Sequence, residues 1–211
     1  MVDKIMLKFA ALGDSLTVGF QSPDIFLPGR EEFPYTQFLE TILVSELPKK
    51  SLSHVEVYFK NVGMLGDTTR SMLERFDIHV AALEPDYVIV WGGINDLFMI
   101  QSTENILGNL KQIYGRASER GVEPIACTTT SVLGNDLMVS RVVELNDMIR
   151  GYCAEKGIPV ADLFAATSDE HNRLRETFSS DGVHLSYAGY QKVAYTIYYD
   201  VIEPILDELE K

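Results

Sequence analysis

The chain has only two cysteines, Cys127 and Cys153, among its 211 residues. Two cysteines cannot build a disulfide framework, and their spacing fits neither a metal site nor a thioredoxin-type redox motif. We therefore expect both to be reduced core residues. The apolar stretches are no longer than a strand, so no segment is predicted to span a membrane. The first residues, MVDKIMLKF, carry an early acidic residue and a lysine within the apolar run. This pattern differs from a signal peptide and favours a cytoplasmic location.

Basic residues are also scarce. The chain has 18 Lys and Arg against 31 Asp and Glu, which gives a formal net charge of −13. This charge repels phosphate backbones and anionic lipid surfaces, so we expect no nucleic-acid partner. The 46% hydrophobic and 23% charged content is that of a globular protein. A length of 211 residues is enough for one ordinary domain, so we predict a single domain over residues 1–211.

Short β-branched runs alternate with longer amphipathic stretches along the chain, which is typical of a parallel sheet covered by helices. The predicted strands are Ile5–Leu12, Val55–Asn61, Tyr87–Trp91, Glu123–Thr129 and Ile158–Leu163. The predicted helices are Phe33–Leu47, Thr68–Leu83, Asn105–Arg120, Arg141–Lys156 and Ser186–Leu209. The sequence thus predicts an α/β fold.

Three irregular stretches exceed a minimal connection: Gln21–Glu32, Ser131–Ser140 and Ala165–Ser180. Each comes after a predicted strand. Ligands of open α/β sheets bind in the crevice outside the carboxyl ends of the strands. We therefore expect the functional site at that edge of the sheet.

A serine follows the first predicted strand, in the sequence Gly13-Asp14-Ser15-Leu16-Thr17. A hydroxyl at such a turn is well placed to act as a nucleophile, and the outward-pointing amides of the turn can stabilise an oxyanion. The alternative is that Asp14 and Ser15 only form a turn or a helix cap.

A serine nucleophile needs a base, and the chain offers His54, His79, His171 and His184. The first three lie in stretches where a surface or loop position is expected. His184 differs because it belongs to the sequence Asp181-Gly182-Val183-His184. A carboxylate three residues before the imidazole can reach Nδ1 and leave Nε2 free to take the serine proton. The alternative is a turn into the final helix, with Ser186 as its cap.

Two further turns offer oxyanion donors. The turn NVGMLGDT, residues 61–68, contains glycines whose amides can approach a ligand closely. The turn GGIND, residues 92–96, contains Asn95, whose side-chain NH₂ can donate a hydrogen bond. Either turn can instead serve only to cap the helix that follows it.

Taken together and in this order, GDSLT, NVGMLGDT, GGIND and DGVH resemble the four blocks of the SGNH hydrolases, also called the GDSL family of esterases and lipases. The resemblance spans the chain from Gly13 to His184. It implies a three-layer α/β/α sandwich with a five-stranded parallel sheet, which agrees with the count of strands made above.

The resemblance also implies roles for individual residues. Ser15 would be the nucleophile, His184 the base and then the acid, and Asp181 the residue that orients His184. The oxyanion hole would comprise the backbone amides of Ser15 and Gly66 and the side chain of Asn95. Gly66 is chosen over Gly63 because the glycine of the family belongs to the Gly-Asp-Thr element.

The implied activity is hydrolysis of a small-molecule carboxylic ester through an acyl-enzyme, with no metal or organic cofactor. A thioesterase or lysophospholipase that acts on longer acyl chains is the alternative within the enzymes. A non-catalytic α/β binding module is the alternative outside them. Apolar residues in or near the loops can line an acyl pocket or merely edge the core: Phe20, Phe26, Leu27, Phe98, Met99 and Met138. The sequence does not specify the acyl chain, the alcohol or the oligomeric state.

Overall fold

The fold is built on one sheet of five parallel strands. A computed structural model of the chain describes residues 4–22 and 32–209. The strand order is β2-β1-β3-β4-β5. The strands are β1 (Ile5–Gly13), β2 (Val55–Asn61), β3 (Tyr87–Trp91), β4 (Glu123–Cys127) and β5 (Val160–Ala161). All five predicted strands are confirmed, although β4 ends two residues early and β5 retains only two residues of the predicted run.

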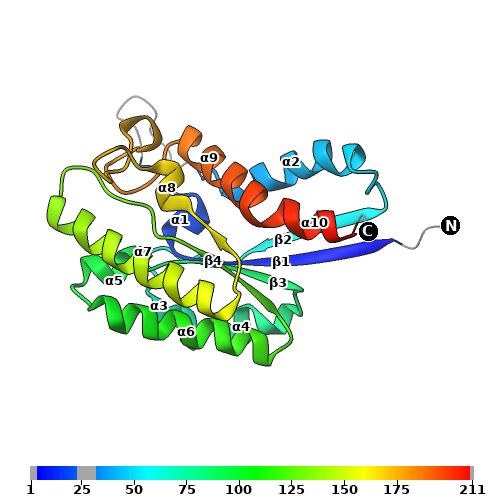
Figure 1. Cartoon of the computed structure of the whole chain (residues 1–211), viewed down its shortest axis with the longest axis horizontal. Coiled ribbons are helices and arrows are strands. Elements are labelled where there is room, and N and C mark those ends of the chain that lie inside the picture. The colour runs from blue at the N-terminus through cyan, green and yellow to red at the C-terminus, as the bar shows by residue number, and fades with distance from the viewer. Residues whose placement is uncertain (1–3, 23–31, 210–211) are drawn as a thin grey trace.

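Helices cover both faces of this sheet and form a three-layer α/β/α arrangement (Figure 1). The α-helices are α1 (Ser15–Val18), α2 (Tyr35–Lys49), α3 (Thr69–Glu74), α4 (Phe76–His79), α5 (Ile94–Phe98), α6 (Thr103–Glu119), α7 (Asp136–Lys156), α8 (Leu163–Thr167), α9 (Tyr187–Ile197) and α10 (Glu203–Leu209). Helices α2, α8, α9 and α10 lie on one face, and α3, α4, α5, α6 and α7 lie on the other. The predicted fold class is therefore confirmed.

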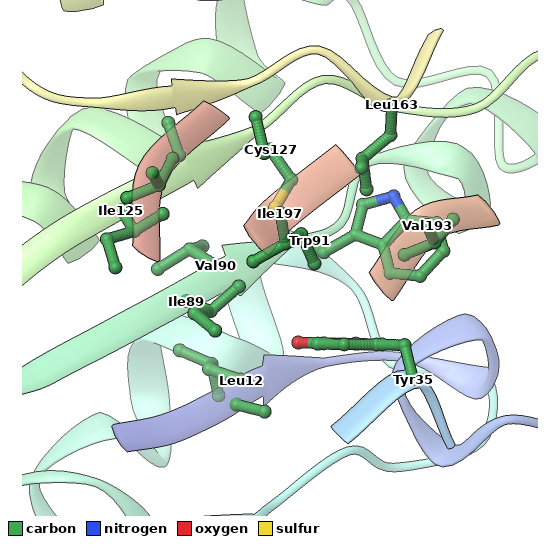
Figure 2. Close-up of a cluster of buried hydrophobic side chains, with 14 of the residues drawn as sticks. Leu12, Tyr35, Ile89, Val90, Trp91, Ile125, Cys127, Leu163, Val193 and Ile197 are labelled. Carbon is green, nitrogen blue, oxygen red and sulfur yellow. The ribbon is translucent and has the colours of Figure 1, made fainter. Parts of the chain in front are cut away.

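The core on the α2–α9 side is apolar and closely packed (Figure 2). Trp91 at the end of β3 is 1% exposed, and its ring meets that of Tyr35 on α2 in an edge-to-face contact, with centroids 5.8 Å apart. Val193 and Ile197 reach the same cluster from α9. Such burial of large side chains is the main force that holds helices on a sheet.

The two cysteines belong to this buried interior. Cys127 and Cys153 are free and almost fully buried. The expectation that both are reduced core residues is therefore confirmed. Burial raises the pKa of the Cys153 thiol to about 11, which keeps it in its unreactive protonated form.

The predicted helix Thr68–Leu83 is not continuous. It divides at Arg75 into α3 and α4 and ends in a short 3₁₀ turn, η1 (Ala81–Leu83). At this division the guanidinium of Arg75 turns inward and binds Asp67 and the carbonyl of Gly13. A hydrophobic pattern cannot reveal that contact.

The predicted helix Ser186–Leu209 begins as expected, with Ser186 accepting a hydrogen bond from the Gly189 amide. A wide π-helical turn, η3 (Tyr198–Ile202), then interrupts it before α10. Pro204 lies just beyond this turn. Proline has no amide to donate to the preceding turn, and its ring crowds the carbonyl four residues back, so a wider turn relieves the clash.

Two of the predicted irregular stretches contain regular structure, so those predictions were partly wrong. Helix α7 begins at Asp136, inside Ser131–Ser140, because the Asn135 side chain caps it by accepting from the Met138 amide. The stretch Ala165–Ser180 contains the end of α8 and a 3₁₀ turn, η2 (Glu176–Phe178). Of the stretch Gln21–Glu32, residues 23–31 lie outside the described residues.

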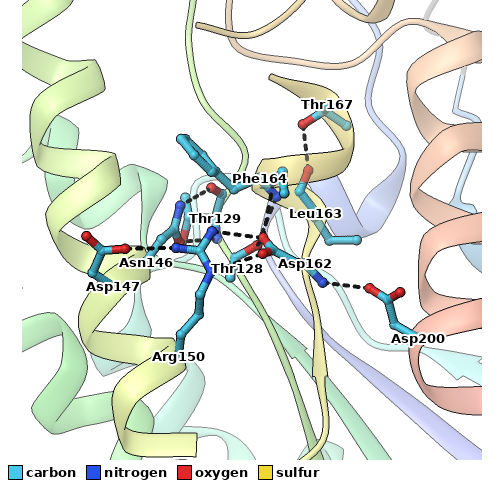
Figure 3. Close-up of polar contacts among 11 residues, drawn as sticks. Thr128, Thr129, Asn146, Asp147, Arg150, Asp162, Leu163, Phe164, Thr167 and Asp200 are labelled. Carbon is cyan, nitrogen blue, oxygen red and sulfur yellow. Dashed lines mark hydrogen bonds and ion pairs between the residues drawn. The ribbon is translucent and has the colours of Figure 1, made fainter. Parts of the chain in front are cut away.

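Side chains, rather than a long strand, secure the sheet edge at β5 (Figure 3). Arg150 of α7 binds both carboxylate oxygens of Asp162 at 3.0 Å, and the Thr128 hydroxyl donates to the same carboxylate at 2.9 Å. Asn146 of α7 binds both backbone groups of Thr129, accepting from the amide at 2.7 Å and donating to the carbonyl at 2.8 Å. These contacts extend the ladder beyond the last residues of β4 and β5.

The topology fixes where a site can form. The chain passes from β1 outward to β2, then crosses to the other side of β1 to form β3, so the direction of winding reverses between β1 and β3. The crevice at such a reversal is the preferred ligand site of open α/β sheets. Ser15 lies two residues after β1, and Asn95 lies four residues after β3. In the described part of the chain, no helix is both long and apolar enough to cross a bilayer.

Candidate active site

The serine of the first block sits at a tight junction between β1 and α1. Ser15 is the first residue of α1, and Asp14 caps the helix by accepting from the Leu16 amide at 2.9 Å. A side chain at Gly13 would overlap the Trp91 carbonyl, because an added Cβ would lie 2.5 Å from that oxygen. Glycine at this position therefore allows β1 and β3 to approach each other beneath the serine.

His184 and Asp181 reach this serine from a loop far along the chain. The Oγ of Ser15 lies 3.0 Å from Nε2 of His184, and Nδ1 of His184 lies 2.7 Å from Oδ2 of Asp181. The other carboxylate oxygen of Asp181 accepts from the amides of Val183 and His184. The structure therefore brings the three predicted residues into one hydrogen-bonded chain.

The electrostatics of Asp181 match this arrangement. Partial burial raises its pKa, but the hydrogen bonds from the His184 ring and from the two amides outweigh burial and hold the pKa below its ordinary value. Asp181 is therefore ionised at neutral pH and can stabilise a proton on the adjacent imidazole.

The second block forms a loop against α1. Asn61 ties the two together, with its NH₂ donating to the Thr17 carbonyl at 2.6 Å and its Oδ1 accepting from the Gly63 amide. The Gly63 amide is thus already bonded. The Gly66 amide has no hydrogen-bond partner among the described residues, and Gly66 lies exposed with φ +73°, in the left-handed region that favours glycine.

The third block places Asn95 on α5 beside the serine turn. Its Nδ2 donates to the Asp67 carbonyl at 2.9 Å and lies 3.4 Å from Oδ2 of Asp14. Since Asp14 precedes Ser15 and Asp67 follows Gly66, Asn95 contacts both of the other donor-bearing turns. The sequence analysis predicted that these three turns lie at one edge of the sheet, and the structure brings them together there.

A buried ion pair that the sequence analysis missed holds two of these turns together. The Arg75 guanidinium lies 2.7 Å from Oδ2 of Asp67 and donates to the Gly13 carbonyl at 3.2 Å. The side chains of Arg75 and Asp67 are only 8% and 2% exposed. A single arginine within a predicted amphipathic helix is expected on the solvated face, so no signal in one sequence distinguishes Arg75.

Asp14 is the most perturbed carboxyl group of the site. It is fully buried, and burial raises its pKa to about 7. The hydrogen bond from the Leu16 amide lowers the pKa, whereas the nearby carboxylates of Asp67 and Asp96 raise it further. The sequence analysis had given Asp14 only a turn or capping role.

The remaining candidate residues from the sequence fall into different places. Among the described residues, no hydrogen bond joins Ser15 to His54, His79 or His171. The Phe20 ring packs edge-on against His184 with centroids 4.6 Å apart. Phe98 and Met99 are exposed at the end of α5, whereas Met138 is buried. Phe26 and Leu27 lie outside the described residues.

Comparisons with known proteins give independent information on the chain. The profile of the GDSL-like Lipase/Acylhydrolase family matches residues 11–192. No curated protein matches the chain. Among solved structures, the lipase/acylhydrolase from Enterococcus faecalis is 23% identical, with a TM-score of 0.73 over 94% of this chain and 96% of that chain.

Two other solved structures share the fold. A mutant of an acetyl-xylooligosaccharide esterase from Geobacillus Stearmophilus is 20% identical, with a TM-score of 0.75 over 95% of this chain and 96% of that chain. An alpha/beta hydrolase enzyme from the metagenome of Lake Arreo, Spain, is 21% identical, with a TM-score of 0.74 over 93% and 95% of the two chains. At these identities the likeness establishes the three-layer fold.

Proposed function

The chain belongs to the GDSL-like lipase/acylhydrolase family, and from this premise we propose that it is a serine hydrolase that cleaves carboxylic esters through an acyl-enzyme. The observation that supports this most is the hydrogen-bonded chain from Ser15 through His184 to Asp181. Three side chains from two distant segments meet in the order that nucleophile, base and orienting carboxylate require.

In the proposed reaction, Ser15 Oγ attacks the ester carbonyl while Nε2 of His184 takes its proton. The tetrahedral intermediate then collapses as His184 returns this proton to the departing alcohol. Water attacks the acyl-enzyme with His184 again acting as base, and release of the acid restores Ser15. Asp181 remains ionised throughout and stabilises the imidazolium form of His184.

The oxyanion of each intermediate would be bound by the amides of Ser15 and Gly66 and by the side chain of Asn95. Neither amide has a hydrogen-bond partner among the described residues, so both are available to a ligand. The left-handed conformation of Gly66 and the hydrogen bond between Asn95 and the Asp67 carbonyl support this assignment. Donors that are fixed before the reaction stabilise developing charge without a cost of reorganisation.

A polar groove and a set of exposed apolar side chains favour different classes of substrate. A groove of about 560 Å³, lined mainly by polar side chains that include Thr68, Asp96 and Asn105, lies between α3 and α6. It would suit a polar alcohol such as a sugar, and one structural relative is an esterase of acetylated xylooligosaccharides. The second candidate, hydrolysis of longer acyl esters or thioesters, is favoured by exposed apolar side chains after β2 and β3: Met64, Leu65, Phe98, Met99 and Ile100.

Labelling by a fluorophosphonate probe tests the proposal directly. The wild-type protein should be labelled and should hydrolyse p-nitrophenyl acetate, and Ser15→Ala should lose both properties because it removes the attacking oxygen. Ser140→Ala, which alters an exposed serine on α7, is the matched control and should be labelled like the wild type. Labelling at another serine, or retained hydrolysis by Ser15→Ala, would contradict the proposal.

Rates on p-nitrophenyl esters from acetate to palmitate, together with acetylated xylose and an acyl-CoA, separate the two candidate substrates. A preference for acetyl groups on a sugar supports the polar groove as the alcohol subsite. Rates that rise with chain length support the second candidate.

A further inference from the structure

One carboxyl group at the site has no role in the reaction as described above. Asp14 is 0% exposed, and its Oδ1 caps α1 through the Leu16 amide. Serine and asparagine cap helices as well as aspartate does and carry no charge. A buried carboxyl group is costly to ionise. Capping therefore does not explain why this position carries an acid, nor what its second oxygen does.

The second oxygen faces the side chain of Asn95. The amide nitrogen of Asn95 carries two protons, and the Asp67 carbonyl binds one of them at 2.9 Å. The Asp14 Oδ2 lies 3.4 Å from the same nitrogen, which is longer than an ordinary N–H···O bond. The second proton is therefore held weakly, beside the residue on which the oxyanion would form.

We propose that Asp14 is a positioning residue for Asn95. In the resting enzyme Asp14 Oδ2 orients the second N–H of the Asn95 amide, and in the tetrahedral intermediate this N–H donates its hydrogen bond to the oxyanion instead. This inference rests on the proposed function. Asp14 does not contact the reacting atoms and acts only through Asn95. No bond to Asp14 forms or breaks.

The ionisation of Asp14 should control how strongly its Oδ2 accepts the hydrogen bond from the Asn95 amide. The carboxylate of Asp67 faces it from the loop before α3, that of Asp96 from α5, and the Tyr190 hydroxyl from α9. On its other sides lie Arg75, bound to the Gly13 carbonyl, and His184, bound to Ser15. Ionised Asp14 binds the Asn95 amide more strongly and repels a neighbouring oxyanion. Neutral Asp14 still accepts from this amide, but more weakly, and carries no charge that repels the oxyanion. Activity should therefore decline as Asp14 loses its proton, at a pKa of about 7.

The same ionisation affects stability. The pKa of Asp14 is raised from 3.8 in the unfolded chain to about 7 in the folded protein. The folded state therefore binds this proton more tightly. The resulting contribution to the free energy of unfolding is fully present below the unfolded pKa and is lost as the pH rises through about 7.

A double-mutant cycle tests whether Asp14 acts through Asn95. Asp14→Ser keeps a cap for α1 but is too short to reach the Asn95 amide. It should lower kcat about tenfold with KM unchanged, a fraction of the roughly 10²–10³ loss caused by removal of a whole oxyanion donor. In the Asn95→Ala background the same change should have no further effect on kcat. An equal loss in both backgrounds would overturn the proposal.

The pH profile provides the second arm. Asp14→Asn keeps the cap and the size of the side chain but cannot ionise. The wild-type kcat should fall on the alkaline side as Asp14 ionises, and this fall should be absent from Asp14→Asn. An unchanged alkaline limb in this variant would contradict the proposal.

A third arm does not depend on catalysis. The side-chain NH₂ signals of Asn95 in a ¹⁵N–¹H spectrum, identified by their loss in Asn95→Ala, should shift with pH in the wild type with a midpoint of about 7. They should not shift in Asp14→Asn, which retains His184. Signals that titrate equally in both proteins, or in neither, would overturn the inference even if the protein hydrolyses no ester. Failure of fluorophosphonate labelling would count against the proposed function alone.

Discussion

The third block, residues 92–96, has either a catalytic or a structural role, and its side chain Asn95 distinguishes the two. Its amide donates to the Asp67 carbonyl, so Asn95→Ala removes one hydrogen bond as well as a proposed oxyanion donor. We expect kcat to fall about a hundredfold with little change in KM, because an interaction made mainly with the oxyanion lowers the barrier and not the affinity for substrate. Steady-state kinetics on the best ester of the series measure this.

The matched control for Asn95 is Asn135, which caps α7. Its side chain also makes one hydrogen bond, accepting from the Met138 amide at 3.0 Å, but it does not line the polar groove. Both alanine variants should lose about 1 kcal/mol of unfolding free energy. Only Asn95→Ala should lose turnover. Equal kinetics for the two variants would assign Asn95 to structure and leave two backbone amides to bind the oxyanion.

At the scale of elements, α7 provides hydrogen-bond partners for the backbone just after β4 ends. Asn146 is 0% exposed and binds both the amide and the carbonyl of Thr129 (Figure 3). Asn146→Leu keeps the volume but leaves both backbone groups buried and unpaired, so we expect a loss of about 2–4 kcal/mol. Chemical denaturation measures this loss.

A substitution on the exposed face of the same helix provides the comparison for Asn146. Glu144→Leu should change the unfolding free energy by less than about 0.5 kcal/mol, because surface positions without specific contacts tolerate substitution. An equally small change in unfolding free energy for Asn146→Leu would mean that the Thr129 backbone groups find other hydrogen-bond partners. The contacts from α7 would then not be needed at the end of β4.

At the scale of the whole molecule, the net charge of −13 acts on every approaching ligand. An acyl-CoA carries several negative charges and should be repelled, whereas a neutral p-nitrophenyl ester should not. Raising the ionic strength from about 20 mM to about 200 mM shortens the Debye length and should raise kcat/KM for the acyl-CoA only.

The neutral ester serves as the internal control for this measurement. Equal salt responses for both substrates would show that long-range charge does not govern association. A fall in kcat/KM for the acyl-CoA with salt would indicate local basic groups at the mouth of the site, and would favour the thioesterase candidate.

The sequence alone determined the strands and the order of the four blocks. Parallel strands buried on both faces appear as continuous β-branched runs, so their positions were visible without a structure. The family blocks then fixed Ser15, Asp181 and His184 as candidates, because a nucleophile and its base must be of particular residue types. The distances between these side chains were not in the sequence.

Only the tertiary structure decided which groups face one another. It divided the predicted helix at Arg75, and it paired the side chain of Arg75 with Asp67 across the site. It also placed Asp14 beside Asn95. Burial and the neighbouring carboxylates raise the pKa of Asp14 to about 7. Local periodicity reports which face of an element is apolar. Contacts between residues distant in sequence depend on how the sheet brings the ends of β1 and β3 together, and no local pattern encodes that.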